Sequence, residues 1–244
     1  MRKLNLLILL LAVFSLQSCF DVVEKMNVKK DGSGTYALSY DFSSILSNPM
    51  MKEMVKESLQ SEDGPFADMM VDGSIEMDTL INLKDSPLAT EMDGDMPEVM
   101  KKAKMAMNLS ETQGVFKMVL SLDFDKVADI ADFYKALQDA GDDQQGFSAI
   151  MPSNGLFELQ GKTLTRRPVD LSKANDAMGD DESMGMMKMM MSGATYTTLY
   201  EFPKKVKSTT IPDAEVGKKT VKVTRDFISL MEGKGNLAGK IKFK

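Results

Sequence analysis

The sequence has no histidine, no tryptophan and only one cysteine, Cys19. Without histidine, the chain cannot form a Ser-His-Asp or Cys-His nucleophile system, or an imidazole-based zinc or haem site. With one cysteine, no disulfide can form within the chain, so packing has to supply the stability. Any catalysis would rest on carboxylates, lysine, tyrosine or serine. The sequence predicts no catalytic residue, no cofactor and a protein that is not an enzyme.

Basic residues are fewer than acidic ones, with 30 Lys and Arg against 36 Asp and Glu and a net charge of −6. Loss of residues 1–18 would remove two bases, Arg2 and Lys3, and no acid, so the net charge would fall to −8. An acidic body argues against nucleic acid as a partner, because phosphate binding needs a basic face. The remaining chain is long enough for one large domain or two small ones.

One long apolar run is present, and it lies at the N-terminus. Arg2 and Lys3 precede the run Leu4 to Leu16. This run is shorter than the roughly 20 residues that a membrane-spanning helix needs, and it fits the apolar region of a signal peptide. Residues 1–18 are therefore predicted to be an export signal.

The export signal ends in Leu16-Gln17-Ser18-Cys19, which resembles the lipobox of bacterial lipoproteins. The resemblance implies cleavage between Ser18 and Cys19 and acylation of Cys19. Two or three acyl chains, at about 0.8 kcal/mol per buried methylene, give a lasting membrane anchor. We therefore expect residues 19–24 to be a lipidated tether and Cys19→Ser to release the protein from membranes. The alternatives are an ordinary secretory signal or a buried structural cysteine.

Residues 25–244 are predicted to form one α+β domain of the cell envelope, an antiparallel sheet of β-hairpins with helices packed on one face. Hairpins are expected over residues 25–41 and 156–167, with glycine-containing turns. Methionine-rich helices are expected near residues 49–59 and 181–192. Residues 193–244 form a strand-rich C-terminal part.

Residues 25–104 and 105–192 are similar enough to suggest a duplicated β-β-α unit. Leu38 to Phe42 reads Leu-Ser-Tyr-Asp-Phe, and Leu120 to Phe124 reads Leu-Ser-Leu-Asp-Phe. A fixed spacing of this kind, about 80 residues, is typical of an internal repeat. The alternative is that any hairpin leading into a helix produces this pattern.

Methionine is the residue in excess, with 23 in the chain. Met184, Met187 and Met191 would share one face of the predicted helix, and thioether sulfur is a soft ligand that favours Cu(I). A methionine-lined groove could instead hold an apolar ligand or a protein partner, and methionine also serves as ordinary core filling. The copper-binding lipoprotein is therefore one alternative function.

Paired acidic residues leave a carboxylate-based hydrolase as a second alternative. They occur at Asp93 and Asp95 and at residues 142–143 and 180–182, where loop solvation also explains them. Asp78-Thr79-Leu80 resembles the short O-glycosylation site of exported Bacteroidota proteins, which makes Thr79 a candidate acceptor.

A small basic run, Lys204, Lys205 and Lys207, follows Phe202-Pro203. It suits contact with anionic headgroups, or a solvated strand edge guarded by lysine. The signal and the first hairpin resemble lipoproteins of Bacteroidota. The turn Asp31 to Gly34 and the segment Tyr200 to Val206 resemble the LppM-type lipoprotein domain. These resemblances imply an envelope domain and no particular activity.

Together these features predict a non-enzymatic, lipid-anchored protein of the cell envelope. Its partners would be the membrane, through acyl chains on Cys19, and an envelope protein or an apolar ligand. The outer membrane is favoured over the inner one.

Overall fold

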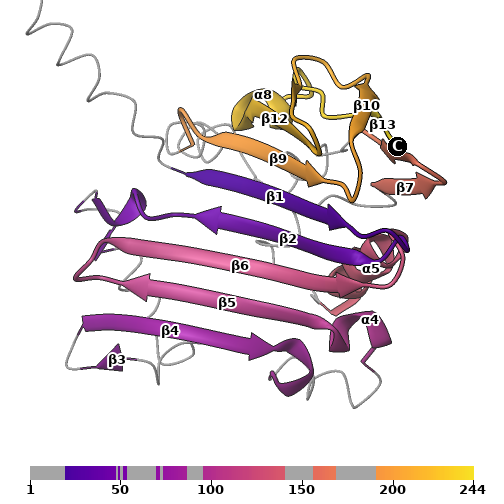
Figure 1. The fold of residues 1–244 in the computed structure, drawn as a ribbon. Coiled ribbons are helices and arrows are strands. Elements are labelled where there is room, and N and C mark those ends of the chain that lie inside the picture. The colour runs from indigo at the N-terminus through magenta and orange to yellow at the C-terminus, as the bar shows by residue number, and fades with distance from the viewer. Residues whose placement is uncertain are drawn as a thin grey trace, which may run out of the picture.

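The computed structural model describes residues 20–47, 49, 52–53, 70–71, 74–86, 96–140, 156–168 and 191–244. These residues form two β-sheets and three short α-helices (Figure 1). Within these ranges, no helix is both long and apolar enough to span a membrane.

The larger sheet has nine strands in the order β11-β12-β9-β1-β2-β6-β5-β4-β3. The strands are β1 (Asp21–Val28), β2 (Gly34–Asp41), β3 (Met70–Val71), β4 (Ser74–Asn82), β5 (Ala103–Ser110), β6 (Val115–Phe124), β9 (Thr195–Glu201), β11 (Glu215–Val216) and β12 (Thr220–Asp226). Every neighbouring pair is antiparallel except β1 and β9, which run parallel. The C-terminal strands therefore join the sheet beside its N-terminal strand.

The smaller sheet has four antiparallel strands in the order β10-β13-β8-β7. They are β7 (Phe157–Gln160), β8 (Thr163–Arg166), β10 (Val206–Thr209) and β13 (Gly239–Phe243). Along β1, buried residues alternate with exposed or half-buried ones, as expected for a strand with one face in the core. Glu24 on the buried face of β1 contacts Arg166 of β8, so the small sheet packs against the large one.

Helices cover only part of the buried face, and the predicted α+β class is wrong. The helices are α4 (Glu98–Lys101), α5 (Asp129–Ala140) and α8 (Phe227–Met231), with 3-10 turns η1 (Ile45–Ser47) and η3 (Leu83–Asp85). Only α5 is long enough to bury a helical stripe, through Ile130, Phe133 and Tyr134. The second sheet supplies much of the remaining cover, so the fold is β-rich with two sheets.

The predicted hairpins are confirmed, as β1–β2 and β7–β8. The helices predicted near residues 49–59 and 181–192 lie largely outside the described residues. The possible duplication stays a prediction, although the β1–β2 and β5–β6 hairpins do lie side by side through the β2–β6 pairing.

The folded body starts immediately after Cys19. Phe20 is 3% exposed, and its ring packs against Phe42 and Phe227 with centroid distances of 4.8 and 5.2 Å. Residues 21–24, which the sequence analysis assigned to a tether, are the first half of β1. One peptide bond therefore separates the predicted acylation site from the hydrophobic core.

Candidate functional site

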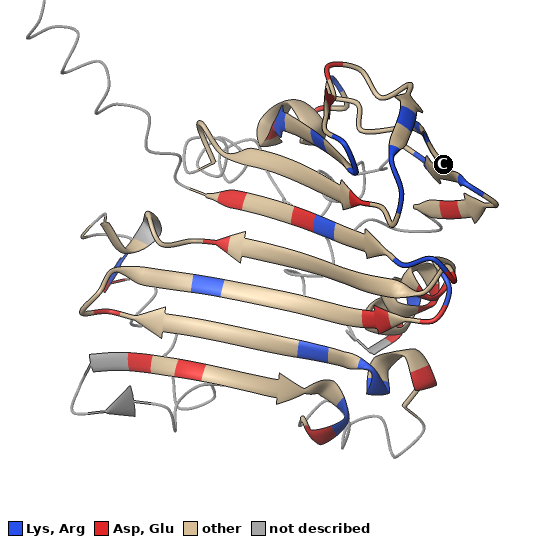
Figure 2. Cartoon of the chain, in the orientation of Figure 1, with Lys and Arg blue, Asp and Glu red and all other residues tan. Residues whose placement is uncertain are grey.

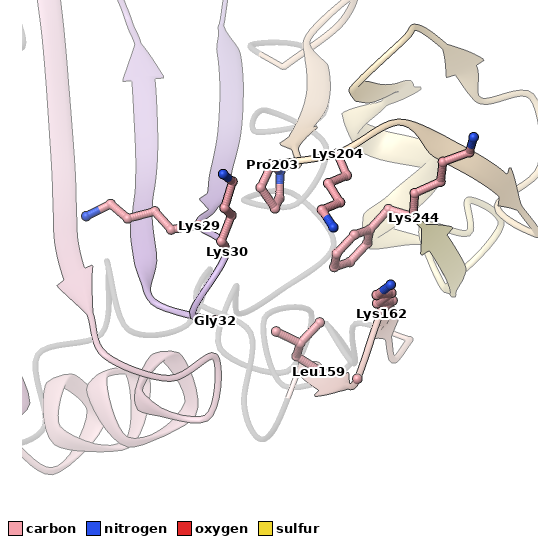
Figure 3. Close-up of a pocket in the computed structure, with 10 residues that line it drawn as sticks. Lys29, Lys30, Gly32, Leu159, Lys162, Pro203, Lys204 and Lys244 are labelled. Carbon is pink, nitrogen blue, oxygen red and sulfur yellow. The ribbon is translucent and has the colours of Figure 1, made fainter.

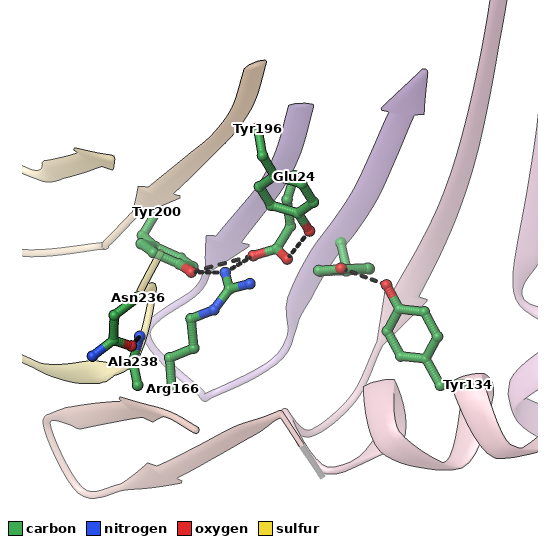
Figure 4. Close-up of polar contacts among 8 residues, drawn as sticks. Glu24, Tyr134, Arg166, Tyr196, Tyr200, Asn236 and Ala238 are labelled. Carbon is green, nitrogen blue, oxygen red and sulfur yellow. Dashed lines mark hydrogen bonds and ion pairs between the residues drawn. The ribbon is translucent and has the colours of Figure 1, made fainter. Parts of the chain in front are cut away.

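A buried polar cluster joins the two sheets around Glu24 (Figure 4). One Glu24 carboxylate oxygen accepts a hydrogen bond from the Tyr196 hydroxyl at 2.7 Å, and the other accepts one from the Tyr200 hydroxyl at 3.2 Å. Arg166 forms an ion pair with Glu24 and also donates to the Tyr200 hydroxyl. The side chains of Arg166 and Glu24 are 1% and 0% exposed, so solvent has no access to this pair.

All five tyrosines of the chain surround this carboxylate. Burial, reinforced by the Glu24 charge, raises the pKa of each of them: Tyr36, Tyr40, Tyr134, Tyr196 and Tyr200. The hydroxyls of Tyr36 and Tyr134 share a hydrogen bond of 2.7 Å between β2 and α5. The contacts of the cluster are internal, although Nε and Nη2 of Arg166 are buried without a hydrogen-bond partner and Tyr196 is half-buried. These contacts suit a structural role in holding the sheets and α5 together.

An open site lies at one end of the sheets, where five lysines and a small apolar surface form a pocket of about 310 Å³. We call this site the lysine pocket. It is lined by Lys29, Lys30, Gly32, Leu159, Gly161, Lys162, Pro203, Lys204, Phe243 and Lys244. Figure 3 shows that the lysines come from the β1–β2 loop, the β7–β8 turn, the segment after β9 and the end of β13.

Backbone hydrogen bonds and close packing hold these segments in place. The amide of Phe243 donates to the Lys162 carbonyl at 3.0 Å, and the amide of Lys244 donates to the Lys205 carbonyl at 3.0 Å. Gly32 has φ +90°, a conformation that glycine adopts without strain, and a Cβ there would lie 3.7 Å from the Leu159 side chain. The lysine backbones are therefore fixed by the fold.

One acid, Asp31, lies beside the lysine pocket, and its charge interacts with that of Lys29. Within the described ranges, none of the pocket lysines forms an ion pair with an acidic side chain. Asp31 lies in the same loop as Lys29, but its carboxylate accepts hydrogen bonds from the Ser33 amide and hydroxyl. A second hollow beside the pocket shares Lys29, Lys30 and Pro203. Figure 3 shows the ammonium groups of Lys29 and Lys244 turned away from those of Lys162 and Lys204, so the last two are best placed to favour an anion.

Three apolar residues of the lysine pocket, Leu159, Pro203 and Phe243, form an apolar floor that adds a second kind of contact. The Phe243 ring stacks on Phe202 at 4.8 Å, so it is held rigidly, and Leu159 and Pro203 lie beside it in the pocket lining. The volume is at the lower end of the range for small-ligand sites, and the lining is richer in charge than is usual for them, with five lysines among ten residues. The arrangement suits a ligand that has both an anionic group and an apolar part.

Most of the site residues predicted from the sequence are outside the described residues. Ser18, Cys19, Met184 and Met187 are outside the described residues, as are the acidic pairs near residues 93–95, 142–143 and 180–182. Met191 is half-buried against the main core. Within the described ranges, no group of three or more His, Cys, Asp or Glu side chains could hold a metal. Thr79 is half-buried in β4 and pairs with the buried Met107.

The sequence analysis identified Lys204 but missed its partners. Lys29-Lys30 and Lys162 each lie at a predicted hairpin turn, and lysines at turn tips are ordinarily solvated. The signal available was the presence of lysines at both predicted hairpin turns. Their convergence follows from the long-range parallel pairing of β1 with β9, which brings Lys204 next to the β1–β2 loop.

Neither the protein-family models nor the sequences of curated proteins give a match to this chain. Among solved structures, the NMR structure of the folded domain of the LppM protein of Mycobacterium tuberculosis is similar. The TM-score is 0.44 and the sequence identity 12%, and the similarity covers 93% of this chain and 90% of that one.

Proposed function

We propose that this protein is a lipid-anchored protein of the cell envelope that binds an anionic, partly apolar ligand in the lysine pocket. The observation that carries the ligand proposal is the pocket itself, with five lysines around Leu159, Pro203 and Phe243. The anchor rests on the lipobox-like sequence ending in Cys19. The lining offers cationic and apolar contacts, which suits binding rather than catalysis.

The ligand class follows from the two kinds of contact. Lysine ammonium groups bind phosphate or carboxylate oxygens through charge-assisted hydrogen bonds. The Phe243 and Leu159 surface would bury a short apolar segment of the ligand. The sequence analysis expected an apolar ligand or a protein partner, and the lysine pocket refines that expectation to a small amphiphile with an anionic group.

Isothermal titration calorimetry on the mature chain carrying Cys19→Ser tests the proposal. Decyl phosphate, below its micelle concentration, should bind, while the uncharged decyl maltoside should not. Decanoate and inorganic phosphate separate the contributions of charge type and apolar tail. The variant Lys162→Gln/Lys204→Gln should weaken decyl phosphate binding more than about tenfold, since hydrogen bonds to charged groups contribute strongly.

The matched control is Lys84→Gln/Lys135→Gln, which removes the same charge from exposed lysines of η3 and α5. It should bind decyl phosphate like the unmodified chain. Equal weakening by both double variants would mean that only net charge matters and would remove the support for a pocket. In cells, Cys19→Ser should move the full-length protein out of the membrane fraction, as the anchor requires.

A further inference from the structure

The strand register fixes which charged residues lie at each end of the larger sheet, and both ends carry acids. β1 and β9 run parallel, so both start at one end, where Asp21 pairs with Thr195, and both finish at the other, where Asn27 pairs with Glu201. β12 is antiparallel to β9, so it starts where β9 finishes. Phe20 and the start of β1 define what we call the anchor end.

The opposite end, which we call the lysine end, collects lysines from successive turns. Lys29 and Lys30 follow β1, Lys204 and Lys205 follow β9, and Lys218 and Lys219 precede β12. The amides of Phe202 and Val206 donate to the carbonyls of Lys219 and Lys218 at 2.9 and 3.0 Å, which ties these turns together. Figure 2 shows blue segments around the β1–β2 loop and along the C-terminal strands, with red segments beside that loop at the end of β6 and in α5.

The outer face of the small sheet extends this charge. Lys240 and Lys242 alternate with the buried Ile241 and Phe243 along β13, and Lys207 lies on the neighbouring β10. The acid on this face, Glu158, is 3.6 Å from Arg167. Residues 195–244 carry 11 Lys and Arg against 5 Asp and Glu, in a chain that is acidic as a whole.

The anchor end carries fewer lysines, and Lys117 there is paired with Asp41 at 3.0 Å. Asp21 and Asp41 pair with each other in the register at the start of β1, and Asp226 closes β12 at the same end. Seven residue steps of about 3.3 Å place the lysine end roughly 23 Å from Asp21. That separation is nearly three Debye lengths at physiological salt, about 8 Å each. With no free residue between Cys19 and the core, the anchor holds this end at its own membrane.

We propose that the lysine end binds a second, anionic lipid surface opposite the membrane that holds Cys19, so that the protein bridges two membranes. This inference rests on the anchor in the proposed function. The dispersed charges are lysines rather than arginines, and lysine acts as a hydrated point charge. That chemistry fits the diffuse attraction of basic side chains to anionic headgroups.

Vesicle clustering tests the bridge. The lipidated protein is reconstituted into phosphatidylcholine vesicles and mixed with protein-free vesicles that contain phosphatidylglycerol, and clustering is followed by light scattering. Clustering is expected with these vesicles, not with pure phosphatidylcholine vesicles, and it should reverse in high salt. Lys205→Gln/Lys207→Gln/Lys242→Gln, which leaves the lining of the lysine pocket intact, should slow clustering more than about tenfold.

The control Lys25→Gln/Lys117→Gln/Lys234→Gln removes equal charge from β1, from β6 at the anchor end and from the turn after α8, and it should cluster vesicles normally. Flotation before mixing shows whether the protein is on the vesicles, so a failed anchor is distinguished from a failed bridge. The lysine-end variant should still bind decyl phosphate, because its pocket lining is unchanged. This titration therefore distinguishes a failure of membrane bridging from a failure of ligand binding in the lysine pocket. Anchored protein that does not cluster phosphatidylglycerol vesicles would overturn the proposal and favour an acidic protein partner. Clustering that the lysine-end variant retains would also overturn it.

Discussion

The β7–β8 hairpin contributes one cation to the buried cluster around Glu24 and another to the lysine pocket, and only the first is paired with an acid. Arg166, at the end of β8, is buried and paired with Glu24. Lys162, in the turn four residues earlier, is exposed and lines the lysine pocket without an acidic partner. A buried charge must be compensated for the fold to exist, whereas an exposed charge costs little and is available to a ligand. The first region therefore supports stability, and the second supports binding.

The largest effect should come from ionising the buried tyrosines, which tests the buried cluster as a whole. Burial first, then the Glu24 charge, raises the pKa of all five above the usual 10.0. Their neutral forms therefore stabilise the fold fully below pH 10, and this stability is lost as pH rises above 10. At pH 11 the loss would reach roughly 6 kcal/mol for the four fully buried tyrosines, Tyr36, Tyr40, Tyr134 and Tyr200, which would titrate only in the unfolded chain.

Absorbance at 295 nm, which reports tyrosinate, should therefore rise only together with loss of the circular dichroism signal. Tyrosinate formed while the fold is intact would show that water reaches the cluster and would remove the distinction between the two regions.

The next largest effect is expected from Arg166→Met. The substitution leaves Glu24 buried without its cation, and breaking a buried ion pair typically costs about 3–5 kcal/mol. Urea unfolding of the mature chain measures this change. The double variant Glu24→Gln/Arg166→Met removes both charges and should lose less than Arg166→Met alone. Additive losses in this cycle would mean that the two side chains do not interact.

Tyr134→Phe should have a smaller effect. It removes one hydroxyl and leaves the buried hydroxyl of Tyr36 without its partner, at a cost of about 1 kcal/mol. Tyr36→Phe should have a similar effect in urea unfolding. Because both variants break the same hydrogen bond, the double variant should cost less than the sum of the two. A full sum would show that the hydroxyls act independently.

Local chemistry made part of the fold predictable. The turn residues Asp31 to Gly34 and Gln160 to Lys162 lie between alternating segments, and both predicted hairpins are present. The parallel β1–β9 pairing and the second sheet depend on residues far apart in sequence, which no local pattern specifies. The predicted class was wrong for that reason.

The two charged regions were hidden from the sequence for different reasons. The sequence analysis placed Glu24 in the tether and Arg166 in a hairpin, and it identified neither as buried, because charged side chains are rarely fully buried. Lys204 was recognised as part of a basic run. Its convergence with Lys162 requires the packing of the two sheets.

The smallest effect on stability should come from Lys162→Gln, the counterpart of Arg166→Met in the same hairpin. Lys162 is exposed and forms no ion pair with a described acid, so its loss should change the free energy of unfolding by less than about 0.5 kcal/mol. Decyl phosphate binding should nevertheless weaken. Urea unfolding and calorimetric titration of the same preparation measure the change in the free energy of unfolding and the change in affinity for decyl phosphate. If Lys162→Gln were as destabilising as Tyr134→Phe, the pocket lysine would belong to the structural network. Arg166 and Lys162 would then both serve the stability of the fold, and the contrast between a structural and a binding cation in this hairpin would be lost.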